Sequence, residues 1–134
     1  MQKSVLIVED EESIALSLEF LLRKEGCAVA CARDGTTALQ MIAQGAPDMV
    51  LLDVMLPLMD GFELCRRIRA DPALKKTRIM MLTARGRENE IARGMSLGAD
   101  AYLTKPFSTR ELMDTVRSLL GGEMPASPRE GARP

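Results

Sequence analysis

Five polar residues stand at or just past the ends of short apolar runs, and their types suit the transfer of a phosphoryl group. They are Glu9, Asp10, Asp53, Thr83 and Lys105. Three carboxylates in one pocket would repel one another unless a cation offsets their charge, and oxygen ligands without histidine suit Mg²⁺. Lys105 could hold a phosphoryl oxygen as a point charge, and the Thr83 hydroxyl could donate a hydrogen bond to another. Such a set of groups suits attack by a carboxylate on phosphorus, which gives an aspartyl phosphate.

Any one of these residues alone would more commonly be a helix cap or a solvated loop residue, so the prediction depends on all five lying at equivalent strand ends. The chain has no histidine, which excludes a Ser–His or Cys–His nucleophile pair and a histidine-ligated metal. Its three cysteines form no CxxC pair and are interpreted as small buried apolar residues: Cys27, Cys31 and Cys65.

Short apolar runs alternate with stretches of helical periodicity, which predicts an α/β fold. Near-continuous apolar runs are typical of parallel strands that are covered on both faces. The five predicted strands lie at 5–8, 27–31, 48–52, 78–82 and 101–103, and the small residues of the second suit an edge. The common orders for such a parallel sheet are 3-2-1-4-5 and the flavodoxin-like 2-1-3-4-5. In the second order, the five polar residues gather at the carboxyl edge of the sheet, around the switch point between the first and third strands.

Helix signals agree with this division. Asp34 is placed to cap the second helix, and Ser108 with Glu111 three residues later predicts a capping box at the start of the last. The fourth helix, near 87–97, has few apolar anchors and is expected to be interrupted by Gly94.

The chain has 134 residues, enough for one domain, which we place at 1–121. Residues 122–134 are rich in Gly, Pro and charge without an apolar period, which predicts a disordered tail or the stub of a linker.

The net charge of −1 and the scarcity of aromatic residues argue against a dominant role in binding nucleic acid or a membrane surface. We expect a cytoplasmic protein, because the sequence has neither a membrane-length apolar run nor a signal-peptide pattern. The basic residues between the third helix and fourth strand are interpreted as solvated: Arg66, Arg67, Arg69, Lys75, Lys76 and Arg78.

Four short stretches occur together, in order and with suitable spacing, over residues 4–120: VLIVEDEE, LLDVMLPLMDGFELC, MLTARG and GADAYLTKPF. Each is short, but their joint occurrence is specific. The sequence strongly resembles the receiver domain of bacterial two-component response regulators, the CheY-like fold. That resemblance implies the 2-1-3-4-5 order of the flavodoxin-like sheet.

The resemblance also implies roles for the acidic residues. Asp53 would be the phosphoacceptor. Asp10 would bind Mg²⁺ directly and Glu9 through water, while the backbone carbonyl of Met55 would be a further ligand. Side chains two positions beyond the acceptor and the switch threonine, here Met55 and Arg85, would control how readily water reaches the phosphoryl group. Their size suggests a phosphorylated state that outlasts those of fast chemotaxis-type receivers.

Further roles follow from the same resemblance. Thr83 and Lys105 would contact the phosphoryl group, and Tyr102 would be an aromatic switch whose rotamer follows Thr83; plain packing of this tyrosine is the alternative. The bond between Lys105 and Pro106 would be cis and would aim Lys105 into the site. Gly61 would serve the turn after the third strand.

The expected signalling surface comprises the fourth helix, the fifth strand and the fifth helix, where the fourth helix is expected to be weakly held and to move. Receivers joined to winged-helix DNA-binding domains often dimerise there through charge pairs, of which Glu111 and Arg117 remain in this chain. Three further positions are uncharged here: Ile91, Ala101 and Thr115. We therefore do not expect a charge-paired dimer, and these residues favour a more apolar docking surface for another protein.

The leading interpretation is a phosphoacceptor switch in a two-component or phosphorelay pathway, and not an enzyme. Because the chain has no histidine, a separate sensor histidine kinase or histidine phosphotransfer protein must supply the phosphoryl group. A second interpretation makes the receiver the N-terminal part of a DNA-binding transcription factor or hybrid kinase. A third is a flavodoxin-like ligand-binding or hydrolytic domain that uses the same Mg²⁺ site. No phosphate- or flavin-cradling loop supports it, and Met55 stands where a haloacid-type phosphatase needs a second aspartate.

Overall fold

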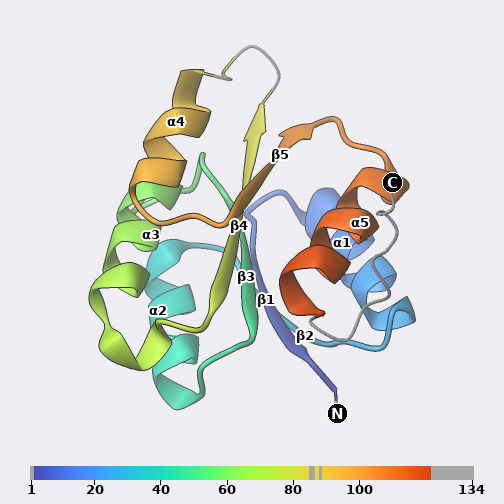
Figure 1. Ribbon diagram of the computed structural model, residues 1–134, viewed down its shortest axis with the longest axis horizontal. Coiled ribbons are helices and arrows are strands. Elements are labelled where there is room, and N and C mark those ends of the chain that lie inside the picture. The colour runs from blue at the N-terminus through green and yellow to red at the C-terminus, as the bar shows by residue number, and fades with distance from the viewer. Residues whose placement is uncertain (1, 85–86, 88, 122–134) are drawn as a thin grey trace.

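The computed structural model describes residues 2–84, 87 and 89–121. All strand pairings are parallel, and the strand order is β2-β1-β3-β4-β5 (Figure 1). The strands are β1 (Ser4–Val8), β2 (Ala28–Ala32), β3 (Met49–Asp53), β4 (Arg78–Ala84) and β5 (Ala101–Lys105). The helices are α1 (Glu12–Lys24), α2 (Gly35–Gln44), α3 (Gly61–Ala70), α4 (Asn89–Ser96) and α5 (Thr109–Leu120), with a short 3₁₀ turn η1 (Pro72–Leu74). The flavodoxin-like order is confirmed, with β2 at an edge. The predicted tail at 122–134 and Arg85 lie outside the described residues.

Helices cover both faces of the sheet, with α2, α3 and α4 on one side and α1 and α5 on the other (Figure 1). Successive strand residues point to opposite faces, so Leu6 belongs to the apolar cluster beneath α2 and α3, whereas Val5 and Ile7 belong to the cluster beneath α1 and α5. Every residue of β3 is buried. Coverage of both faces explains why the sequence before Asp53 is continuously apolar.

Both predicted helix caps form, and α3 has a further cap. The carboxylate of Asp34 accepts a hydrogen bond from the backbone N–H of Thr37 at 2.7 Å. Ser108 and Glu111 make a reciprocal capping box at the start of α5. Asp60 caps α3 by accepting from the N–H of Glu63 at 2.9 Å. These bonds satisfy N–H groups that have no partner within the helix, and so fix where each helix begins.

The fourth helix differs from the expectation. It runs unbroken over Asn89–Ser96, and Gly94 is its one buried residue. A Cβ atom on Gly94 would lie 2.7 Å from the Sδ atom of Met81. The glycine therefore lets α4 approach β4 closely, and the prediction that it interrupts the helix was wrong.

Two predictions about side-chain exposure also fail. Arg69 is not a solvated arginine: its guanidinium donates to the carbonyl oxygens of Thr77 at 2.6 Å and Gly98 at 2.8 Å, and to the Asp100 carboxylate at 2.8 Å. A partly buried guanidinium has donors enough for several backbone acceptors, which composition alone does not indicate. Cys31 is exposed rather than buried, because β2 is an edge strand, whereas Cys27 and Cys65 are buried as predicted.

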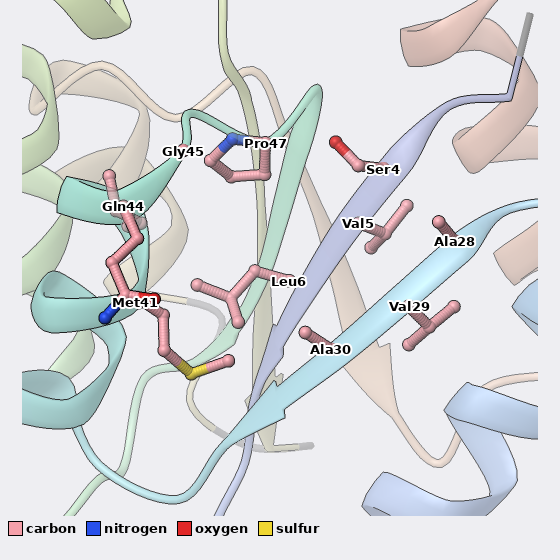
Figure 2. A pocket seen from close by; sticks show the side chains of 11 residues that line it. Ser4, Val5, Leu6, Ala28, Val29, Ala30, Met41, Gln44, Gly45 and Pro47 are labelled. Carbon is pink, nitrogen blue, oxygen red and sulfur yellow. The ribbon is translucent and has the colours of Figure 1, made fainter.

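A hollow of about 270 Å³ lies between α2 and the first halves of β1 and β2, at the amino edge of the sheet (Figure 2). It forms because Ala28 and Ala30 are small and leave space beside Leu6 and Met41, which both line it. Its lining contains no acidic residue, so it is separate from the acids at the carboxyl edge. Among the described residues, no helix is both long and apolar enough to span a membrane.

Candidate phosphoacceptor and metal site

Three carboxylates converge at the carboxyl edge of the sheet. Glu9 and Asp10 follow β1, and Asp53 ends the neighbouring strand β3. Each can offer an oxygen such that all three oxygens lie within 4.8 Å of one another. Asp10 is exposed, whereas Glu9 and Asp53 are only 2% and 6% exposed. The predicted acidic cluster is therefore present, and its hard oxygen donors fit a Mg²⁺ ion.

Lys105 reaches this cluster from the end of β5. Its ammonium nitrogen lies 2.8 Å from Oδ2 of Asp53 and 3.2 Å from Oε1 of Glu9. Burial alone would lower the pKa of Lys105, but the hydrogen bond and charge of Asp53, together with Glu9, outweigh burial and raise that pKa. The lysine consequently remains a cation in a site that contains three acids.

The environment of Glu9 perturbs its ionisation. Its pKa is raised, first by burial and then by the negative charge of Asp53, while the N–H of Glu11 and the Lys105 cation act in the opposite direction. A second cation beside Glu9 would relieve both the burial penalty and the repulsion. The site is therefore electrostatically prepared for a divalent ion.

Backbone amides fix the orientation of the two buried carboxylates. The N–H of Met55 donates to Oδ1 of Asp53 at 3.0 Å, and the N–H of Glu11 donates to Oε2 of Glu9 at 3.1 Å. Lys105 contacts the other oxygen of each carboxylate. Each carboxylate thus has one oxygen held by the main chain and one directed toward a cation, so little reorganisation is needed to bind a ligand.

Thr83 is buried near the end of β4, beside β3, and its hydroxyl is unusual. Oγ1 of Thr83 is the single buried side-chain polar atom without a hydrogen-bond partner in the part of the chain that the structure describes. An unsatisfied buried hydroxyl costs about 1–3 kcal/mol. Such an orphan group at the edge that carries the acids indicates a position where a ligand oxygen can be accommodated.

Tyr102 lies on β5 with 46% of its surface exposed. Tyr102 and Thr83 both line a narrow gap of about 10 Å³ between α4 and the sheet, which we call the α4 seam. Ile91, Gly94 and Met95 line the seam from the helix side. The arrangement places the tyrosine and the orphan threonine beside the same helix.

Gly61 has a role that the sequence did not reveal. It is the first residue of α3 rather than a turn residue, and its N–H donates to the carbonyl of Val54 at 2.9 Å. A Cβ atom there would collide with the backbone oxygen of Asp53 and lie 2.6 Å from Cδ1 of Leu52. The glycine therefore lets α3 begin directly behind the candidate phosphoacceptor. The family resemblance implied only a turn at this position.

The remaining predicted residues lie around this core. The Lys105–Pro106 peptide bond is cis. The Met55 side chain is exposed beside Asp53. Arg85, the second predicted rate modulator, lies outside the described residues.

The charges left on the predicted signalling surface are used within the chain. Glu111 belongs to the capping box of α5, and the Arg117 guanidinium binds both carboxylate oxygens of Glu25 at 2.7 and 3.0 Å. Ile91 and Ala101 are half-buried. These pairings fit the expectation that this face does not form a charge-paired dimer, which stays a prediction.

Comparison with known proteins agrees with this geometry. A family model described as the response regulator receiver domain matches residues 5–117. A Chloroflexus aurantiacus structure described as a response regulator is 41% identical with a TM-score of 0.86, and the match covers 90% of this chain and 98% of that one. The chemotaxis response regulator CheY4 of Vibrio cholerae is 32% identical with a TM-score of 0.84, over 90% of this chain and 100% of that one.

A third similar structure bears on the metal. The receiver domain of a Pseudomonas aeruginosa sensor histidine kinase is 30% identical with a TM-score of 0.82, over 90% of this chain and 99% of that one, and contains a magnesium ion coordinated in its active-site cleft. The fold and the acidic edge define the class of CheY-like proteins of two-component signalling. This chain belongs to the response regulator receiver domain family.

Proposed function

We propose that this receiver is a phosphoacceptor switch in which Asp53 takes a phosphoryl group from a phosphohistidine on another protein. The observation that supports it most is the convergence of Glu9, Asp10 and Asp53 within 4.8 Å, with Lys105 at 2.8 Å from the acceptor carboxylate. The chain contains no histidine, so a phosphohistidine donor would have to come from outside this sequence. It would belong to a sensor histidine kinase or a histidine phosphotransfer protein.

Two further expectations stay predictions: the cytoplasmic location, and the end of the receiver domain at residue 121.

Glu9, Asp10, Asp53 and the backbone carbonyl of Met55 would hold Mg²⁺. The ion would supply positive charge that offsets the acids and the incoming phosphoryl oxygens. In the transfer, an oxygen of Asp53 forms a bond to phosphorus while the phosphorus–nitrogen bond breaks, and the histidine leaves with the electron pair of that bond. Oδ1 of Asp53 accepts from the Met55 N–H and Oδ2 accepts from Lys105. Oδ2 is the candidate nucleophile, because Lys105 would move from it to a phosphoryl oxygen.

Phosphorylation would change the partners of two side chains. Lys105 now binds the free carboxylate of Asp53, and would instead bind a phosphoryl oxygen. Thr83 would donate its unpaired hydroxyl to another phosphoryl oxygen. These contacts exist only in the phosphorylated chain, so they would bias it toward a second conformation. Tyr102 and α4 line the same seam as Thr83, and would carry the change to the α4–β5–α5 face and a downstream protein.

Incubation with Mg²⁺ and acetyl phosphate, followed by intact mass measurement, tests the proposal. The wild type should gain one phosphoryl group, and EDTA should abolish the gain. Asp53→Asn keeps the shape of the acceptor and should gain none. A gain that persists in Asp53→Asn would overturn the site assignment, and no gain in the wild type would overturn the proposed function.

The same incubation with acetyl phosphate tests the prediction that the chain is not an enzyme. A switch should hydrolyse only its own aspartyl phosphate, so phosphate release from acetyl phosphate should run no faster than the decay of that aspartyl phosphate. Continued turnover of acetyl phosphate far above the wild-type decay rate of the aspartyl phosphate would contradict it. That decay rate also tests the prediction of a long-lived phosphorylated state.

A further inference from the structure

Helix α3 holds the region of α4 at two places that differ greatly in strength. At the end of α3, Arg69 donates to the carbonyl of Gly98, just after α4, and to the carboxylate of Asp100. Asp100 in turn accepts from the N–H of Ile79 at 2.8 Å, and its own N–H donates to the Ile79 carbonyl at 2.8 Å. The segment that follows α4 is therefore tied to α3 and to β4 by several hydrogen bonds.

The contact at the middle of α4 is much weaker. Phe62, in the first turn of α3, packs against α4, and the guanidinium carbon of Arg93 lies 4.2 Å from the centroid of its ring. Gly94 is the one buried residue of α4, so the helix buries little apolar surface of its own. Phe62 is buried but Arg93 is exposed. A solvent-exposed cation over an aromatic ring stabilises a contact only modestly. Figure 1 shows α3 and α4 side by side on one face of the sheet.

We infer that α4 is pivoted at Arg69 and latched at Arg93, so that the Arg93–Phe62 contact sets how readily the receiver leaves its unphosphorylated conformation. The pivot comprises Arg69, Gly98 and Asp100, and the latch comprises Arg93 and Phe62. The inference rests on the proposed function and names a regulatory residue, Arg93, that touches neither the acids nor Lys105. Arg93 is thus a positioning residue that acts through α4.

The Arg93–Phe62 latch favours the conformation in which Tyr102 lies outside the α4 seam, because that seam is narrow. A gap of about 10 Å³ has no room for a tyrosine ring, so any inward movement of Tyr102 must displace α4 from the sheet. Such a displacement carries Arg93 away from Phe62, whereas the pivot stays bonded. The stacking energy therefore belongs to the conformation with Tyr102 outside, and its loss favours the other conformation.

The latch is also mechanically close to the phosphoacceptor. Phe62 follows Gly61, whose position is fixed by the N–H bond to Val54 and by the lack of space for a Cβ beside the backbone oxygen of Asp53. A change in the backbone around Asp53 would thus move the ring on which Arg93 rests. This route passes through α3 and does not use Thr83.

Beryllium fluoride with Mg²⁺, a stand-in for the phosphoryl group, tests the latch by calorimetric titration. Arg93→Gln removes the cation and should bind beryllium fluoride about two- to fivefold more tightly than the wild type. Arg93→Lys retains a cation and should stay close to the wild type. Arg67→Gln is the matched control, because Arg67 is an exposed arginine of α3 whose only binding partner among the described residues is Glu63. General damage would weaken binding, so a gain in affinity separates the latch from a merely structural role.

Tyr102 supplies an independent spectroscopic readout, because the chain has one tyrosine and no tryptophan. Arg93→Gln should move the tyrosine fluorescence of the ligand-free chain toward that of the beryllium fluoride complex. In a Phe62→Leu background, Arg93→Gln should give no further gain in affinity. If Phe62→Leu does not fold, the comparison of Arg93→Gln with Arg93→Lys decides alone.

The outcomes separate the two proposals. A wild type that binds and an Arg93→Gln variant with equal or weaker affinity would overturn the latch and leave the proposed function intact. Equal gains for Arg93→Gln and Arg67→Gln would also overturn it, because the effect would then be one of net charge. A wild type that binds no beryllium fluoride would overturn the proposed function and the latch together.

Discussion

The amino and carboxyl edges of the sheet contain similar polar side chains, but these side chains have different hydrogen-bond partners at the two edges. Thr77, just before β4, and Thr83, near its end, are 4% and 3% exposed. The hydroxyl of Thr77 donates to the Pro47 carbonyl at 2.8 Å, whereas that of Thr83 has no partner among the residues that the structure describes. Likewise, Arg69 at the amino edge binds several neutral backbone acceptors and one acid, whereas Lys105 at the carboxyl edge holds two acids.

The difference shows that the carboxyl edge is not arranged for stability. Satisfied polar groups make the amino edge a fixed frame for the ends of α3 and α4. The carboxyl edge keeps an orphan hydroxyl, crowded acids and, in the loop after β3, Leu58 with a positive φ of 71° and 85% of its surface exposed. Each of these features costs stability in the isolated chain, and such costs concentrate where proteins bind and react.

The largest expected loss of stability comes from removing the hydrogen bonds that Arg69 makes at the amino edge. Arg69→Met should lower the free energy of unfolding by about 2–3 kcal/mol, because it leaves a partly buried carboxylate and backbone carbonyls without their donor. Urea unfolding measures the loss. Arg66→Met is the matched control: within the described part of the chain this exposed arginine of α3 binds only Glu63, so its loss should stay below about 0.5 kcal/mol. Equal losses would contradict the assigned role of the network.

A side chain added at Gly61, behind Asp53, should destabilise the chain mainly through steric crowding. Gly61→Ala should lower the free energy of unfolding by about 1–3 kcal/mol, because its methyl group meets backbone atoms that cannot move cheaply. Gly45→Ala serves as the control, since a Cβ there has no heavy atom within 4 Å. The same urea titrations compare the two alanine variants. A Gly61→Ala variant as stable as Gly45→Ala would show that α3 can shift away from the acceptor strand.

The two threonines give the sharpest contrast between the edges. Thr77→Val should destabilise the chain by about 1–2 kcal/mol, because it removes a satisfied buried hydrogen bond. Thr83→Val should leave stability unchanged or raise it by up to about 1 kcal/mol, because it replaces an unsatisfied hydroxyl. Thermal unfolding at neutral pH measures both. Thr83→Val should nevertheless take up less phosphoryl group from acetyl phosphate, and losses of stability of equal size would contradict the contrast.

The smallest effect is expected where α5 meets α1. The hydrogen bonds from Arg117 lower the pKa of Glu25 below its usual value of 4.5. A pKa depressed by folding stabilises the folded chain above pH 4.5, and that stabilisation is lost as the pH falls through the folded value. Glu25→Gln should therefore cost about 0.5 kcal/mol at pH 7 and progressively less below pH 4.5. Urea unfolding at several pH values measures this, and a difference that grows in acid would contradict the assigned sign.

Patterns in the sequence predicted most of the fold and the chemical groups of the site. The apolar runs indicated β3 and its neighbours because buried parallel strands exclude polar residues, and Asp34 and Ser108 indicated caps because their bonds are local. The order of the strands and the roles of Tyr102 and Met55 came from resemblance to a family. The structural roles of Gly94 and Arg69 could not be predicted, because both depend on contacts between elements distant in the sequence.

Gly61 shows the same limit inside the site. The family resemblance implied a turn there, but the importance of Gly61 comes from a distance to the backbone of Asp53 that only the assembled fold defines. The orphan state of Thr83 is likewise a property of its surroundings. Sequence patterns therefore identified which side chains could react, and the three-dimensional structure identified what keeps them in place.

Hydrogen exchange with and without Mg²⁺ and beryllium fluoride tests the contrast between the edges most directly. The account predicts altered exchange in the loop between β3 and α3 and in α4. It predicts unchanged exchange at the amides of Ile79 and Asp100, which pair at the amino edge. Changes of equal size at those two amides, or no change in α4, would contradict a fixed amino edge and a responsive carboxyl edge.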